Sequence, residues 1–337
     1  MKKLLMFATA LLFTAGTMAQ TNDFYDDATL NALTTSKLMV EGEVANPGTV
    51  DFSTLPLRSV IVKETAFDGK DGKFIGAYQY EGYSIYDILN QTVLQKKNEA
   101  EFPPIIDLYV EVENAAGEKV VLSWGEIYYP VHQHEIIIAT TVRRIVPSKT
   151  KDLWPMPVNS KLVVAADLFT ERNIENPVKI TVKSSTVNYK IDRQIPEMYS
   201  KKVDFMLKDE LVRSVSAVDS DWTILTYAHV FYGRGSGIHG TTPFSGVLLK
   251  EVAEDIFPSS KENLRTGMII TAGLDGYRGI YSYSEVFNRN DQAELLLAPR
   301  TGVVKEGAFM LFPSMDFFSD RAIRSLMEVR MIDADDL

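Results

Sequence analysis

An internal repeat restricts how this chain folds, because two copies of one pattern require two copies of one structural unit. Four sequence blocks of the first half recur in the second half, in the same order and with similar spacing. Such self-similarity is the sequence signature of a duplicated unit. The first-half blocks are residues 80–89, 107–128, 135–139 and 161–182, and their counterparts are residues 244–253, 268–287, 294–298 and 308–331.

Each copy predicts the order strand, helix, hairpin, strand, strand. Apolar residues alternate along residues 108–112 and 178–182, which is typical of half-buried strands. A short amphipathic helix is expected in each copy, near residues 85–94 and 248–256. The predicted fold class is therefore α+β and β-rich, with two tandem repeats.

Changes in composition divide the chain into segments. Residues 184–204 are polar and contain Pro196, as expected of a linker. The predicted segments are a signal peptide at 1–19, an N-terminal lead-in at 20–37, a first repeat at 38–183, the linker at 184–204 and a second repeat at 205–337.

The first residues predict export. Lys2 and Lys3 precede an apolar stretch at residues 4–16, and Ala19 is a small residue at the expected cleavage position. This order of positive, apolar and small residues is typical of a secretory signal peptide, and the apolar stretch is too short to span a bilayer. We therefore expect a periplasmic or secreted protein, cleaved near Ala19, without a transmembrane segment in the mature chain.

Charge and cysteine content limit the chemistry. The chain has 45 acidic and 35 basic residues and a formal charge of −10, which disfavours binding to nucleic acid. It contains no cysteine, which excludes a thiolate nucleophile and cysteine-bound metals. The expected partner is a small anionic or polar molecule or an envelope protein.

The opening of the first repeat carries a family resemblance. Residues 38–47 have the form L-x-V-x-G-x-V-x-N-P, and Leu55-Pro56 follows. Residues 80–89 show an aromatic-x-Gly pattern before a short helix. These motifs resemble the molybdopterin-binding domain of the sulfite oxidase family, over residues 38–183 and more loosely over 211–332. The resemblance implies two tandem molybdopterin-binding-fold repeats.

The resemblance also bears on activity. In enzymes of that family, molybdenum is held by the pterin dithiolene and one protein cysteine, which lies between the first strand and the first helix. The matching stretches here, residues 60–69 and 223–231, contain no cysteine. The resemblance therefore implies a scaffold without its molybdenum ligand, so we expect no resident cofactor, no catalytic residues and a binding or accessory role.

A glycine-rich stretch at residues 229–243 carries the predicted ligand site. Glycines let backbone N–H groups approach an anion, and an arginine adds a bidentate donor. Alternatives are an oxidoreductase in which two histidines hold a divalent metal or a pterin, and a structural envelope protein whose stretch is an ordinary hairpin. The candidates are His229, Arg234, Gly235, Gly237 and His239, with His229 and His239 as the metal pair.

Three further candidates lie later in the second repeat. Arg300 follows an apolar strand, and Asp316 and Arg321 lie in a loop that the resemblance places near the cofactor. A surface turn with local ion pairs is the alternative for that loop. His132 and His134 precede the strand at residues 136–138, where the sequence favours a solvated loop over a metal pair.

Overall fold

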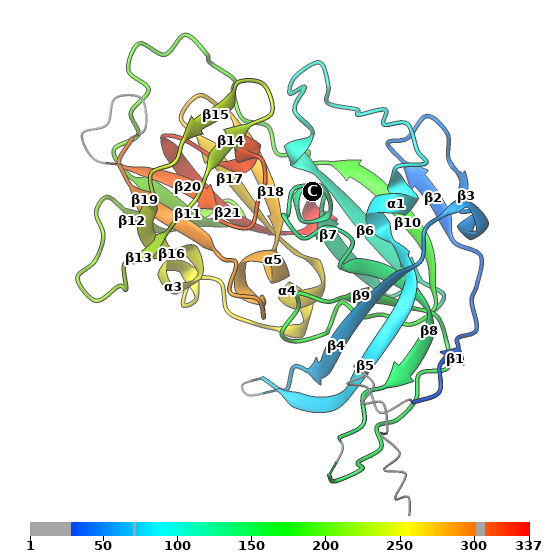
Figure 1. Ribbon diagram of the computed structural model, residues 1–337. Coiled ribbons are helices and arrows are strands. Elements are labelled where there is room, and N and C mark those ends of the chain that lie inside the picture. Colours follow the sequence, from blue (N-terminus) through cyan, green and yellow to red (C-terminus); the bar gives the residue numbers. More distant parts are fainter. Residues whose placement is uncertain (1–27, 70–71, 148, 301–306) are drawn as a thin grey trace, which may run out of the picture.

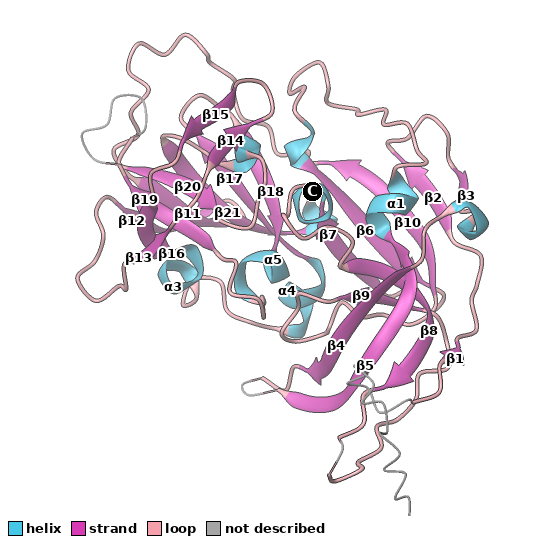
Figure 2. Ribbon diagram, in the orientation of Figure 1, coloured by secondary structure: helices cyan, strands magenta, loops and turns pink. Residues whose placement is uncertain are grey.

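The computed structural model describes residues 28–69, 72–147, 149–300 and 307–337. The expected signal peptide at 1–19 and the first part of the lead-in lie outside these residues. Of the described residues, 43% lie in strands and 13% in helices, and Figure 2 shows strands throughout both halves. None of the helices described is long and apolar enough to cross a membrane.

The first half, residues 31–184, forms two five-stranded sheets (Figure 1). One sheet has the order β3 (Gly48–Thr49), β2 (Met39–Gly42), β10 (Pro177–Ser184), β6 (Leu108–Asn114) and β7 (Lys119–Ser123). The other has the order β1 (Asn31–Ala32), β8 (Ile136–Arg144), β5 (Lys73–Ser84) and β4 (Arg58–Ala66), and β9 (Lys161–Val164) also pairs with β8. The helices are η1 (Phe52–Thr54), α1 (Ile85–Leu89), η2 (Ile105–Asp107) and α2 (Trp124–Tyr128).

The second half, residues 203–336, forms two larger sheets and a small hairpin. One sheet has the order β12 (Glu210–Val215), β11 (Val203–Leu207), β21 (Leu326–Asp333), β17 (Gly267–Gly273) and β18 (Arg278–Ser282). The other has the order β13 (Leu225–Tyr227), β16 (Phe244–Leu248), β19 (Leu295–Pro299) and β20 (Phe309–Pro313), and β14 (Phe231–Gly233) pairs with β15 (Gly237–Gly240). The helices are α3 (Leu249–Ala253), α4 (Lys261–Thr266), α5 (Tyr283–Phe287), η3 (Ser319–Arg321) and η4 (Ala334–Asp336).

The two halves repeat one strand order. In the first, β10 is parallel to β2 and antiparallel to β6; in the second, β21 is parallel to β11 and antiparallel to β17. The turns match as well, since Gly117 and Gly276 have φ of 82° and 78°, while Asn176 and Ser325 have φ of 54° and 50°. Repeated strand order and repeated turn geometry show a duplicated unit. The boundaries predicted for the two repeats, 38–183 and 205–337, stay predictions.

The predicted fold class is wrong. The structure is β-rich, and its four larger sheets lie in a four-bladed, propeller-like arrangement rather than in an α+β molybdopterin-type fold. The helix expected at residues 85–94 ends at Leu89, and the one expected at 248–256 is limited to Leu249–Ala253. Helices of five residues form corners between strands and are too short to build the helical layer of an α+β domain.

Serines explain why these corners form where they do. Ser84, Ser123 and Ser282 each end a strand and cap the helix that follows. In each case the hydroxyl accepts a hydrogen bond from the backbone N–H three residues later. This satisfies a donor that a helix start leaves open, so the chain turns from strand to helix at a defined residue.

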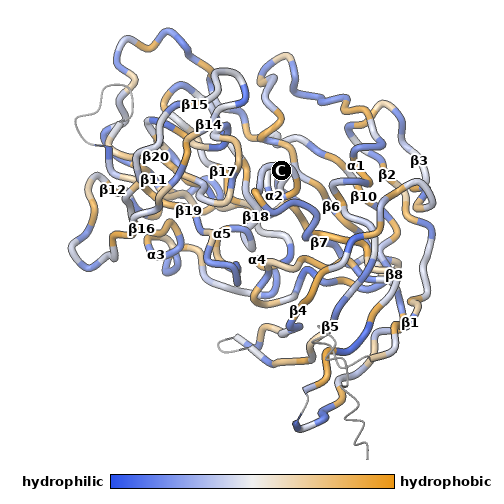
Figure 3. The backbone as a smooth tube through the Cα atoms, viewed as in Figure 1, coloured by the Kyte–Doolittle hydropathy of each residue, from blue (hydrophilic) through white to orange (hydrophobic). Residues whose placement is uncertain are grey.

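Apolar residues hold each half together and join the halves. The strands of both halves carry hydrophobic stretches (Figure 3), and each half has a large buried cluster of its own. A further cluster joins Tyr109 and Val121 of the first half to Ile270 and Ile280 of the second. The sheets that contain β7 and β18 therefore bury a shared core, and polar loops at its rim can form sites between the halves.

Candidate functional site

The glycine-rich stretch forms the hairpin β14–β15. Gly237 at its turn has φ of 71°, a conformation that favours glycine. At position 233, a Cβ would lie 2.4 Å from Nε2 of His239, so a side chain there would displace the histidine. Gly233 and Gly237 thus have local structural reasons to be glycine, and Gly233 leaves the space that the imidazole of His239 occupies.

This hairpin forms one wall of a cavity of about 450 Å³, which we call the hairpin pocket. The opposite wall comes from the turn after β17 and from the loop around η3. Arg234, Gly235 and His239 of the predicted set line it. The remaining lining residues are Met198, Phe231, Gly233, Ser236, Asp275, Tyr277, Ser319, Asp320, Ala322 and Arg324.

Two arginines differ in how they are held. Arg234 Nη1 donates to the hydroxyl of Tyr129 at 3.2 Å, and its Nε lies 3.9 Å from Oδ2 of Asp320. Burial raises the pKa of Asp320, and the charges of Arg234 and His239 oppose that rise. Arg324 is exposed and makes no hydrogen bond or ion pair with any residue that the structure describes. The pocket therefore holds one anchored and one available guanidinium.

Two other predicted residues lie apart from this pocket. His229 packs edge-on against Phe312, with ring centroids 4.9 Å apart, and burial lowers its pKa. Arg300 lies 6.0 Å from the ring of Phe244. Among the described residues, no group of three or more histidine, aspartate or glutamate side chains could hold a metal ion. The metal pair of His229 and His239 stays a prediction.

Asp316 and Arg321 lie in the interior, with 2% and 0% of their surfaces exposed. Arg321 Nη2 donates to Asp316 at 2.6 Å and lies 2.7 Å from Oε1 of Glu285. Burial raises the pKa of Asp316 to about 6, although the charge of Arg321 opposes the rise. These two candidates therefore form a buried ion-pair cluster and do not line the hairpin pocket.

The first half contains the same cluster. Arg172 Nη2 donates to Asp167 at 2.7 Å, and Arg172 Nη1 donates to Glu126 at 2.9 Å. Sequence reasoning missed this cluster. The signal was an aspartate followed five residues later by an arginine, which occurs at Asp167 and again at Asp316.

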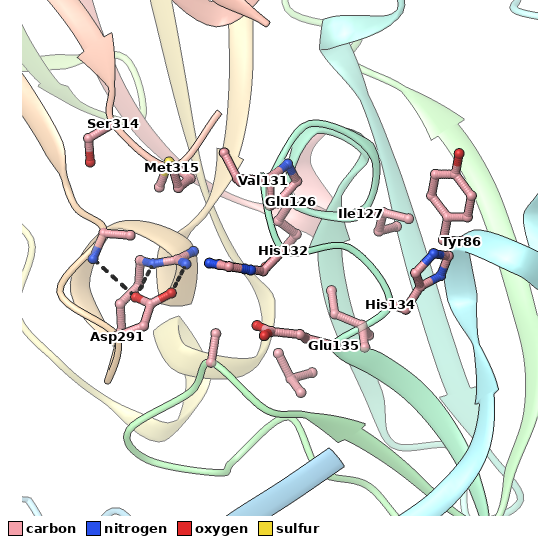
Figure 4. A pocket seen from close by; sticks show the side chains of 16 residues that line it. Tyr86, Glu126, Ile127, Val131, His132, His134, Glu135, Asp291, Ser314 and Met315 are labelled. Carbon is pink, nitrogen blue, oxygen red and sulfur yellow. Dashed lines mark hydrogen bonds and ion pairs between the residues drawn. The ribbon is translucent and has the colours of Figure 1, made fainter. Parts of the chain in front are cut away.

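A second cavity, of about 260 Å³, lies between the halves; we call it the His-Glu pocket (Figure 4). His132, His134 and Glu135 line it from the first half, and Arg289 and Asp291 from the second. The sequence favoured a solvated loop for these histidines. No sequence pattern signalled the pocket, because its facing walls come from the loops before β8 and β19, which lie far apart in the chain.

No family model matches this chain, and no curated protein matches its sequence. The resemblance to the sulfite oxidase family therefore stays a prediction.

Proposed function

We propose that this chain is an exported, noncatalytic binding protein whose hairpin pocket holds a small polar ligand with an anionic group. The observation that carries this proposal is Arg324, an exposed guanidinium without a described partner that lines a polar cavity. A guanidinium presents paired donors that match a carboxylate or a phosphate, so an anionic group is its natural partner.

The other groups of the pocket refine the ligand. Arg234 is oriented by Tyr129, so its position is set before a ligand arrives. The carboxylates of Asp275 and Asp320 line the same cavity and offer acceptors to hydroxyl or amino groups. They also repel a polyanion. The expected ligand is therefore a small molecule with an anionic group and hydrogen-bond donors.

Gly235 supplies a steric test. A Cβ at this position meets no atom within 4 Å, and the backbone there is not left-handed. The Gly235→Val variant should therefore fold normally while its side chain enters the pocket. Gly240→Ala is the matched control, because Gly240 lies in the same hairpin but does not line the pocket. A Cβ at this position would lie 3.8 Å from the nearest atom, so the variant should also fold normally.

The experiment is a thermal-shift and calorimetric titration of the mature chain with succinate, inorganic phosphate and, as a neutral control, 1-propanol. We expect saturable binding of an anion that Gly235→Val and Arg324→Gln weaken at least about tenfold. Gly240→Ala and Arg213→Gln, which removes an arginine paired with Asp255 elsewhere, should bind like the wild type. Binding that survives both pocket variants, or no anion binding at all, would contradict the proposal.

A further inference from the structure

The His-Glu pocket differs from the hairpin pocket in charge and in lining. Figure 4 shows His132 and Glu135 extending from the first half toward Asp291 of the second half. Ile127, Ile136 and Met315 contribute apolar surface to the same cavity. An apolar cavity with a few convergent polar groups is the usual form of a small-molecule site.

One carboxylate of this pocket has no bonded counter-ion among the described residues. Asp291 is neutralised by Arg289, whose Nε donates to Oδ1 at 2.9 Å. Glu126 is bound through both oxygens by Arg172. The carboxylate of Glu135, in contrast, makes no hydrogen bond or salt bridge within the described part of the chain.

Neither nearby histidine is bonded to the carboxylate of Glu135 among the described residues. His134 Nδ1 lies 3.1 Å from Ser84 Oγ and 3.4 Å from Asp87 Oδ2, and burial lowers its pKa. His132 is exposed and acts on Glu135 only through the field of its protonated form. An unneutralised, half-buried carboxylate attracts a cation.

We propose that the His-Glu pocket binds a small organic cation with an apolar body, and that Glu135 is its counter-ion. The apolar wall fits a hydrocarbon group, and the carboxylate fits an ammonium group at its edge. A cavity of roughly 150 Å³ holds benzene, so 260 Å³ accommodates a ring that carries an aminomethyl group. Within the described residues no cluster suits a metal ion, which favours an organic cation.

The proposed pairing requires an ionised Glu135. Burial raises the pKa of Glu135, and Asp291 adds to the rise, whereas His132 and Arg289 oppose it. His134, with Asp87 and Arg58 behind it, and the Glu126–Arg172 pair complete the charged groups around the cavity. Affinity for a cation should therefore fall as pH decreases through the pKa of Glu135, and a bound cation should lower that pKa.

Titration calorimetry with benzylammonium tests the proposal, with benzyl alcohol as a neutral analogue of the same shape. We expect saturable binding of benzylammonium alone, weakened at least about tenfold in Glu135→Gln, which keeps the size and removes the charge. Glu99→Gln removes an exposed carboxylate elsewhere and should bind like the wild type.

The pH dependence of benzylammonium affinity is a second measurement. It distinguishes loss of the charge at Glu135 from misfolding of the variant. Wild-type affinity should fall from about pH 7 to about pH 4, whereas any residual affinity of Glu135→Gln should depend much less on pH once His132 and His134 are replaced by Asn in both backgrounds. Equal binding of benzyl alcohol, equal affinity of wild type and Glu135→Gln, or no binding of benzylammonium would each overturn the proposal. Anion binding at the hairpin pocket is measured separately and does not depend on this result.

Discussion

Arg172 of the first half donates from Nη1 to the hydroxyl of Ser282 in the second half, at 3.0 Å. The reciprocal contact joins Arg321 of the second half to Ser123 of the first, at 3.5 Å. Both serines cap helices, so each arginine reaches across to the helix start of the other half. The duplication therefore extends to the contacts between the halves, and a buried arginine from each half takes part in them.

Replacing either arginine should destabilise the fold strongly. Arg321→Met would leave Asp316 and Glu285 buried without their cation, and removing one partner of a buried pair costs about 3–5 kcal/mol. Arg172→Met should have a similar cost, because Asp167 and Glu126 lose the same support. Urea unfolding followed by circular dichroism measures the free energy of unfolding.

The control for this prediction is Arg213→Met. Arg213 pairs with Asp255 at the surface, and exposed pairs contribute under about 1 kcal/mol. If Arg321→Met unfolds at the same urea concentration as the Arg213 variant, the buried clusters do not hold the halves together.

The buried arginines also mark a limit of sequence reasoning. Charged residues are almost always at the surface, so the sequence favoured a surface turn around Asp316 and Arg321. Recognising the cluster requires knowing that Glu285, in the first turn of α5, and Ser123, from the other half, lie within reach. The repeat could be recognised from the sequence because each of its blocks is a short continuous segment. The residues that contact Arg172 and Arg321 from the other half are brought there only by the tertiary structure.

Ser123 should contribute more to the free energy of unfolding than an ordinary helix-capping serine does. Ser123 Oγ accepts from the N–H of Glu126 at 2.8 Å and donates to Oε2 of Glu285 at 2.6 Å. Ser123→Ala removes both bonds in a buried site, and we expect a loss of about 1–3 kcal/mol. Ser260→Ala removes the cap of α4, which accepts from Asn263 alone, and should cost about 1 kcal/mol. Equal losses in the two variants would show that the contact to Glu285 is without energetic effect.

Matched glycines allow a test of the strand pairing in both halves. A Cβ at Gly82 would lie 2.0 Å from the carbonyl oxygen of Ile138, and one at Gly246 would lie 2.6 Å from that of Leu297. Because paired strand backbone cannot move away easily, Gly82→Ala and Gly246→Ala should each lower the free energy of unfolding by about 2–3 kcal/mol. Gly48→Ala is the control, since its Cβ meets nothing within 4 Å. Thermal unfolding of the variants should show a lower Tm only for the first two.

The hairpin pocket was partly readable from the sequence. The glycine pattern and Arg234 singled out one wall, because glycine-rich loops with a nearby arginine are a local signal. Asp320 and Arg324 of the opposite wall lie more than eighty residues later, and only the fold brings them there. Arg300 and His229 were expected nearby, but their side chains pack on Phe244 and Phe312.

Glu135 should make the stability of the chain depend on pH. Burial raises its folded-state pKa above the ordinary value of 4.5, so the folded chain binds more protons than the unfolded chain between these values. Its contribution to stability is therefore present below about pH 4.5 and lost as pH rises through the folded-state pKa. Glu135→Gln cannot ionise, so its stability relative to the wild type should increase from pH 4 to pH 7. Urea unfolding of both proteins at each pH measures this difference. A difference that is constant with pH would mean that Glu135 ionises in the folded chain as it does in water, and the pocket would then offer a cation no more than an ordinary surface carboxylate does.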